Sequence, residues 1–158
     1  FLQAILRVLK IRNDLCIVLI GRDVNLNNKE ISKEIPIDYR KYFKFLNEKN
    51  DAQFFMHSFD FLCLSSLSES FPNVIAEAMS IGIPVVSTDV GDAKYLIGDS
   101  GITVPAENPI ALHEGINGLL DMGKENRINL GLEAQKRINS KFSLLSYCDN
   151  YKKIILKL

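Results

Sequence analysis

The sequence predicts a doubly wound, Rossmann-like α/β fold with a parallel sheet and additional C-terminal helices. Short, nearly all-apolar runs alternate with helical patterns from residue 1 to about residue 104. Such runs are typical of strands buried on both faces, and parallel strands need crossovers, which the helices supply. The length of 158 residues, 47% of them apolar, is enough for one well-cored domain. We therefore expect residues 1–158 to form a single domain.

The first half of the chain contains three such strand and helix patterns. Leucine and isoleucine recur at helical spacing near the N-terminus, and the next apolar run ends at Gly21. The polar segment that follows predicts a loop with one short helix. In order, we expect a helix over 1–11, a strand over 15–20, a loop over 22–40 with a helix near 29–33, a strand over 42–46 and a helix over 51–57 capped by Asp51.

The second half continues the alternation and then becomes helical. Proline and glycine punctuate it at the expected element boundaries. We expect a strand over 59–64, a helix from Phe71 or Pro72, a strand over 83–88, a helix over 93–97, a strand over 102–104, a helix of about a dozen residues capped by Asn108, and helices over 124–139 and 143–157.

Composition excludes several classes of function. Lysine plus arginine and aspartate plus glutamate both number 19, so no global field favours nucleic acid. Cys16, Cys63 and Cys148 lack metal-ligand spacing, and the first two fall in expected buried strands, which argues against a disulfide or zinc framework. A reducing cytoplasm fits best. No apolar run reaches the about 18 residues of a membrane span. Because Phe1 begins within a helical pattern, we expect a fragment of a longer protein.

One stretch, residues 68–79, changes from strand to helix periodicity. Glu69 and Glu77 bracket the change, with seven residues between them, and Pro72 suits a first helical turn because its φ is already helical. A strand that turns directly into a helix leaves the first amides of that helix unpaired. Free amides and the helix dipole together favour an anion. The stretch therefore predicts an anion site between two carboxylates.

The other loops that follow strands are expected at the same edge of the sheet. Ligands of open α/β sheets lie beyond the carboxyl ends of the strands, where Gly21 and the loops over 47–50, 65–71 and 89–92 are expected. Within the helix, Glu77 shares a stripe with Asn73 and Ser80, opposite the apolar Ile75, Ala78 and Met79. Either glutamate alone is readily explained as a surface acid. Together they offer acceptors for sugar and ribose hydroxyl groups beside an anion pocket.

These residues resemble a known family. The segment from Glu69 to Met79, followed by Gly82-Ile83-Pro84-Val85-Val86, resembles the E-x7-E region of retaining glycosyltransferases of the GT-B fold, family 4. The likeness covers residues 1 to about 140. It also includes Val18-Leu19-Ile20-Gly21, Phe45-Leu46, Asp60, Ser65, Ser66, Thr88-Asp89-Val90-Gly91, Gly101-Ile102-Thr103-Val104-Pro105 and Pro109.

The resemblance implies a C-terminal domain that binds a UDP- or GDP-linked sugar donor as substrate, with no other cofactor and no metal. Glu77 would accept hydrogen bonds from the ribose, and Glu69 would contact the donor sugar near the reacting carbon. The region of Phe71, Pro72, Asn73 and Val74 would hold the distal phosphate and sugar, and the loop with Asn47 and Lys49 would meet the base, near Gly21. Transfer would retain anomeric configuration, to a saccharide or lipid-linked acceptor held by an N-terminal domain.

The sequence also departs from the family pattern. The cationic phosphate clamp of the family belongs to a strand, loop and helix unit that would end about where Phe1 begins, so this chain is expected to lack it together with the first strand of the domain. Asp92 and Tyr95 stand near positions where the family commonly has glycine and glutamate, and Asn47 replaces a usual glycine. Arg22 follows the wrong strand to replace the clamp.

Two other functions remain open at this point. One is a nucleotide-sugar-binding module without catalysis. The other is a glycoside hydrolase that uses Glu69 and Glu77 as acid and base. The C-terminal segment, with Lys152, Lys153 and Lys157 among apolar residues, fits packing against the rest of a longer protein or peripheral contact with the inner face of the cytoplasmic membrane. The lone histidines His57 and His113 are interpreted as structural.

Overall fold

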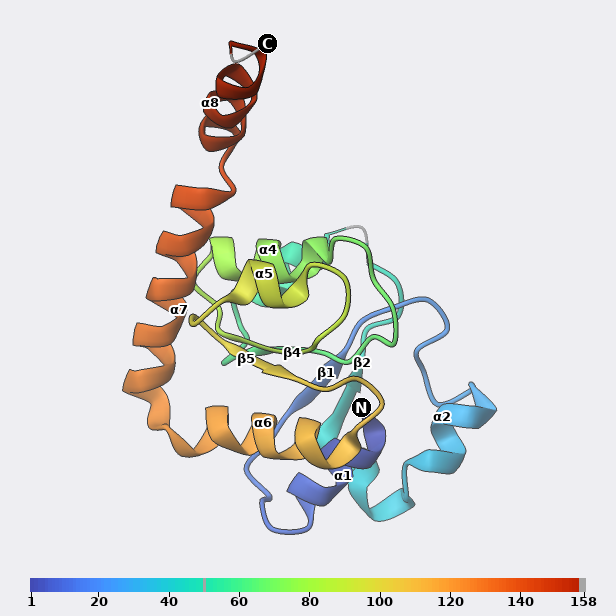
Figure 1. Ribbon diagram of the computed structural model, residues 1–158. Helices are drawn as coiled ribbons and strands as arrows, with labels where there is room; N and C mark the ends of the chain where they lie inside the picture. Colours follow the sequence, from blue (N-terminus) through green and yellow to red (C-terminus); the bar gives the residue numbers. More distant parts are fainter. Residues whose placement is uncertain (50, 157–158) are drawn as a thin grey trace.

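A computed structural model describes residues 1–49 and 51–156 and confirms the predicted α/β class (Figure 1). Short parallel strands lie between two layers of helices. The elements of the first half are α1 Leu2–Leu9, β1 Ile17–Leu19, α2 Lys29–Glu34, the 3-10 helix η1 Ile37–Tyr42, β2 Phe43–Phe45 and α3 Ala52–Met56. Those of the second half are β3 Leu62–Leu64, α4 Asn73–Ser80, β4 Val85–Thr88, α5 Ala93–Ile97, β5 Ile102–Val104, α6 Pro109–Asp121, α7 Gly123–Lys141 and α8 Leu144–Ile155.

The strands form two parallel sheets where the sequence predicts one. β1 pairs with β2, which places Ile17 opposite Phe43. The second sheet has the order β3-β4-β5, with Leu62 opposite Val85 and Val86 opposite Ile102. No ladder among the described residues joins β1 to β3. The expectation of a continuous sheet is therefore corrected, although every paired strand is parallel as predicted.

Two apolar clusters cover the two faces of the sheets. Val86 of β4 packs into a cluster with α1 and α6, whereas the adjacent Val85 packs into a cluster with α4, α5 and α7. Neighbouring residues of a strand point to opposite faces, so both being fully buried shows that β4 is covered on each side. Figure 1 shows the same arrangement, with α1 and α6 on one side of the strands and α4 and α5 on the other.

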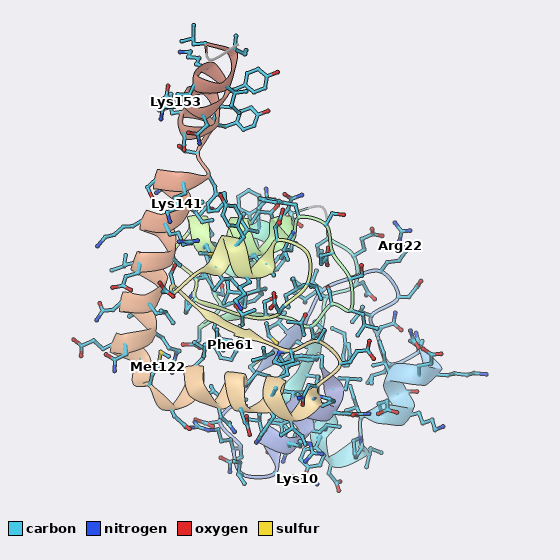
Figure 2. All side chains as sticks on the ribbon, viewed as in Figure 1. Lys10, Arg22, Phe61, Met122, Lys141 and Lys153 are labelled. Carbon is cyan, nitrogen blue, oxygen red and sulfur yellow. The ribbon has the colours of Figure 1, made fainter. Side chains whose placement is uncertain are left out.

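A large cavity separates the two sheets. Its volume is about 910 Å³, and its lining includes Val18 of β1 and Cys63 of β3, with Ile116 and Leu120 of α6 on one wall. Phe61, which precedes β3, also lines it and lies in the middle of the molecule (Figure 2). Below, "the slot" means this cavity between the edges of β1 and β3.

Most of the predicted boundaries agree with the structure, and four local predictions are wrong. Pro72 precedes α4 instead of lying in its first turn, because the chain is still non-helical there, with ψ at 87°. Asp51 makes no side-chain cap to α3. Cys16 is exposed and precedes β1. Residues 37–42, expected to be loop as far as residue 40 and strand from residue 42, form η1. Residues 50 and 157, which fall in a predicted turn and helix, lie outside the described part.

Other predictions of helix ends are confirmed. The Asn108 side chain accepts hydrogen bonds from the amides of Ile110 and Ala111 at 3.1 and 3.0 Å, as expected of an N-cap. Gly82 ends the α4 segment with a φ of 80°. Its carbonyl oxygen lies so close to Gly131 of α7 that a Cβ atom there would collide with it. The absence of a side chain at Gly131 thus lets α7 pack directly on the end of α4.

Helix α8 stands apart from the body of the domain (Figure 1). It contains no buried residue, and Leu144 and Leu145 are 77% and 78% exposed. Lys153 lies on this projecting helix (Figure 2). Among residues 1–49 and 51–156, no helix combines the length and apolar character needed to cross a membrane. In the described part of the chain, α8 therefore exposes apolar side chains and extends from an otherwise packed domain.

Candidate functional site

Glu69 lies in the loop between β3 and α4, where one of its carboxylate oxygens is held. The Ser66 hydroxyl group donates a hydrogen bond of 2.7 Å to Oε1 of Glu69. Oε2 accepts no hydrogen bond from the described residues. The side chain is half-buried, so the carboxylate is fixed on one side and open on the other.

The loop after β4 holds the loop that carries Glu69. The Thr88 hydroxyl donates to the carbonyl of Ser66 at 2.7 Å, and the amide of Asp92 donates to the carbonyl of Ser70 at 3.0 Å. Between these two bonds, Gly91 has a φ of 51°, and a Cβ atom there would collide with the carbonyl oxygens of Glu69 and Ser70. The two loops can approach this closely only because residue 91 is glycine.

Helix α4 presents open amides and a carboxylate next to this loop. No side chain among the described residues caps the helix, and the amides of Asn73 and Val74 come before the first amide that donates to a carbonyl of this turn, that of Ile75 to Pro72. Phe71, just before the helix, is 42% exposed. Glu77 is exposed on the same side as Asn73, whereas Ile75, Ala78 and Met79 are buried, which confirms the predicted division of the helix into a polar and an apolar face.

The loops after β1 and β2 meet at the other predicted group of residues. The Gly21 amide donates to the Asn47 carbonyl at 3.0 Å, and the Asn25 side chain donates to the Asn47 side chain at 3.1 Å. Asn47 has a φ of 53°. Asparagine tolerates this left-handed region better than most residues, which explains how it replaces a usual glycine there. Lys49 is exposed.

Arg22 pairs with the loop after β2. Its guanidinium group donates to both carboxylate oxygens of Glu48, at 3.1 and 3.0 Å. This hydrogen bonding raises the pKa of Arg22 above its usual value. The side chain is exposed and points away from the body of the domain (Figure 2). Sequence reasoning did not find this pair, because neither its spacing nor its residue types distinguish it from other surface charges.

The predicted site residues thus fall into two groups. Those from Glu69 to Glu77 lie together on the unit that joins β3 to α4, whereas Gly21, Asn47 and Lys49 lie on the loops that follow β1 and β2. The slot lies between the two sheets. The sequence supplied no role for Ser66, although a hydroxyl residue three positions before Glu69 is the signal that could have suggested one.

Metal-ligating residues do not gather in the described part of the chain. There, no group of three histidine, cysteine, aspartate or glutamate side chains is arranged to hold an ion. His57 is exposed. His113 contacts the side chain of Asn117 one helical turn away, at 3.1 Å. His57 directly follows α3 and His113 lies on α6, so both are outside the two groups of site residues.

Comparison with known proteins identifies the family. Residues 1–122 match the family described as Glycosyl transferases group 1. The chain belongs to this family. Phosphatidyl-myo-inositol mannosyltransferase of Mycobacterium leprae is 29% identical over 143 residues, which cover 86% of this chain and 37% of that protein. The predicted family membership is therefore confirmed.

Solved structures of similar fold cover nearly the whole chain. Anabaena HepE, crystallised in complex with UDP, has a TM-score of 0.81 at 22% identity, covering 99% of this glycosyltransferase chain and 44% of HepE. The C-terminal domain of the group 1 glycosyltransferase LpcC from Francisella tularensis has a TM-score of 0.74 at 19% identity, covering 91% of this chain and 78% of that domain. These likenesses show the fold. The chain spans about two fifths of the length of the mannosyltransferase and of HepE.

Proposed function

We propose that this chain is the donor-binding part of a retaining glycosyltransferase of the GT-B fold that moves a hexose from a UDP- or GDP-linked donor to a saccharide or lipid-linked acceptor. One observation carries the proposal. The Glu69 carboxylate, which has one oxygen bonded to Ser66 and the other open, lies on the same unit as the unpaired amides at the start of α4. Family membership and the UDP complex of HepE support it.

The distal phosphate of the donor would bind at the α4 end. The open amides of Asn73 and Val74 and the helix dipole favour its negative charge. Phe71 and Pro72 shape the approach to these amides, and Pro72 itself is buried and therefore fixed in place. This end of the site binds an anion without needing a metal ion.

The two glutamates would take different hydroxyl groups. Glu77, exposed beside Asn73, accepts hydrogen bonds from the ribose. The open oxygen of Glu69 accepts one from the donor sugar and stabilises positive charge as the bond to the nucleotide breaks, so Glu69 acts by electrostatics and positioning. The base binds near Gly21, Asn47 and Lys49. Transfer by attack on the same face as the departing nucleotide would retain anomeric configuration.

The acceptor would bind to a part of the protein outside residues 1–158, in an N-terminal domain. The apolar face of α8 is available to pack there, and its neighbouring lysines allow peripheral contact with an anionic membrane. Reaction at the cytoplasmic face would suit a nucleotide-sugar donor. Because the acceptor would bind elsewhere, the isolated chain would bind a donor but would not complete transfer.

We also propose that one further apolar strand fills the slot and joins the two sheets into one. The edges of β1 and β3 that face the slot lack strand partners among the described residues, and both strands belong to parallel ladders. A strand added between them would satisfy backbone groups on both sides. It would also fix the spacing between the two groups of site residues.

Hydrogen exchange in the full-length gene product tests the added strand. The backbone amides of β1 and β3 that point into the slot should exchange as slowly as those of β4, which has a partner on both sides. Exchange at the rate of the surrounding loops would show an empty slot. That result would contradict the added strand and would leave the proposed donor site unaffected.

Calorimetry tests donor binding. The same protein is titrated with UDP, GDP, UDP-glucose and GDP-mannose, and one nucleotide with its sugar ester should bind. A folded protein that binds none of the four would refute the proposed function. Release of free sugar from an activated glycoside, lost on substitution of either glutamate, would instead favour a hydrolase.

Substitution of Glu77 tests the ribose contact. Glu77→Ala should raise the donor KM about tenfold, because a carboxylate bond to a hydroxyl group is lost. Glu133→Ala on α7, another exposed glutamate on a helix, serves as the control and should leave KM unchanged. Equal KM values for the two variants would remove Glu77 from the site.

Donor binding by the full-length protein without transfer to any acceptor would favour a non-catalytic module.

A further inference from the structure

We propose that Ser66 and Thr88 are positioning residues that hold the Glu69 carboxylate in its working orientation, an inference that rests on the proposed donor site. Neither residue would contact the donor. Each acts on the next through a hydrogen bond of 2.7 Å, from the Thr88 hydroxyl to the Ser66 carbonyl and from the Ser66 hydroxyl to Oε1 of Glu69.

The chain of contacts begins at a fixed point. Thr88 is 4% exposed and ends β4, which has a strand partner on each side. Its side chain therefore has a well-defined position from which to hold a neighbouring loop. The carbonyl that it binds belongs to Ser66, so the backbone at residue 66 is tied to the centre of the sheet.

The far end of the loop is fixed by a second, independent contact. The amide of Asp92 binds the carbonyl of Ser70, and Gly91 packs against the backbone of residues 69 and 70. Glu69 therefore lies between two anchored positions, 66 and 70. With the backbone held on both sides, the remaining freedom of Glu69 is that of its side chain.

The Ser66 hydroxyl removes most of this freedom. A hydrogen bond to an ionised carboxylate is shorter and stronger than one between neutral groups, and it selects which oxygen of Glu69 faces the protein. Oε2 is then the oxygen left to face a ligand. Positioning within a fraction of an ångström matters for catalysis, so loss of this bond should impair reaction more than binding.

The test measures release of UDP from UDP-glucose, or of GDP from GDP-mannose, by the protein as its gene encodes it. Transfer to water suffices, so the acceptor need not be known. Ser66→Ala should lower kcat about tenfold, the fold-change expected for one hydrogen bond to a charged group, and change the donor KM less than threefold. Ser66→Thr keeps a hydroxyl group and should restore most of kcat.

Two controls separate positioning from folding. Ser140→Ala removes an exposed serine of α7, outside both groups of site residues, and should leave kcat unchanged. Thr88→Val removes the hydroxyl group and should lower kcat as Ser66→Ala does, whereas Thr88→Ser should restore it. If Thr88→Val fails to fold, the comparison of Ser66→Ala with Ser66→Thr still tests the proposal, because Ser66 is less buried than Thr88.

The outcomes also separate this inference from the proposed function. Loss of activity in Glu69→Gln together with wild-type kcat in Ser66→Ala would overturn the positioning role alone. Wild-type kcat in Glu69→Gln would overturn the role of Glu69 and with it that of Ser66. A Ser66→Thr variant as slow as Ser66→Ala would also contradict the proposal, because the hydroxyl group would then not be the cause.

Discussion

The two halves of this domain differ in how completely they are packed. Around β4, helices cover both faces and strands lie on both sides, and the loop that carries Glu69 is anchored at two points. Within residues 1–49 and 51–156, β1 has a strand partner on one side only and borders the slot on the other. The sugar end of the proposed site therefore belongs to a self-supporting unit, whereas the base end belongs to a sheet whose position depends on what fills the slot.

Among matched substitutions in the two halves, the one in the complete half gives the largest expected loss of stability. Ile75 of α4 is fully buried, whereas Ile17 of β1 is 8% exposed and lines the slot. Ile75→Ala should lower the free energy of unfolding of the 158-residue chain by about 4 kcal/mol, and Ile17→Ala by about 2 kcal/mol, because a residue beside an existing void leaves less new cavity. Urea denaturation measures both. Equal losses would show that the two halves are packed alike.

Helix packing in the complete half gives a slightly smaller effect. Gly131→Ala would place a Cβ atom against the carbonyl of Gly82, which should cost about 3 kcal/mol because the atom that it meets belongs to the backbone and cannot turn aside as a flexible side chain could. Gly118→Ala is the matched control. Its Cβ atom would lie 3.3 Å from the end of the flexible Ile102 side chain, and the gain in helix propensity, about 1 kcal/mol, should leave the chain at least as stable. Equal thermal midpoints for the two variants would contradict the close packing.

Local patterns predicted much of this fold. The change of hydrophobic period at residues 68–79 located the β3–α4 unit, and the Asn108 cap followed from residue type alone. The separation into two sheets did not follow, because strand neighbours are set by contacts far apart in the sequence. The hydrogen bond from Ser66 to Glu69 was missed for a related reason. It requires the loop conformation, which Thr88 and Gly91 impose from 20 or more residues away.

The pH dependence of stability should report whether the Cys63 thiol in the slot is buried. Burial raises the pKa of its thiol from 9.0 to about 12. The neutral thiol is thus favoured in the folded chain, so its contribution to stability is complete below pH 9 and is lost as the pH rises toward 12. Between pH 8 and pH 10 the chain should lose about 1 kcal/mol. Cys63→Ala should not show this loss.

The same thiol should resist alkylation. At pH 8, iodoacetamide should modify the exposed Cys16 and Cys148 well before Cys63, because the thiolate is the reactive form. Modification of all three at one rate would show that the slot is open to solvent in solution. Mass spectrometry of the digested protein distinguishes the three sites.

Removal of α8 should have the smallest effect, because neither half relies on it. The helix buries no residue, whereas Phe142 at the end of α7 packs edge-on against Tyr95 at 5.3 Å between ring centres. Truncation after Phe142 should therefore change the free energy of unfolding by less than about 1 kcal/mol, and further substitution of Phe142 by alanine should lower it by about 3 kcal/mol. A large loss on truncation alone would mean that α8 packs against the domain in solution, and that its apolar face is not free for another part of the protein.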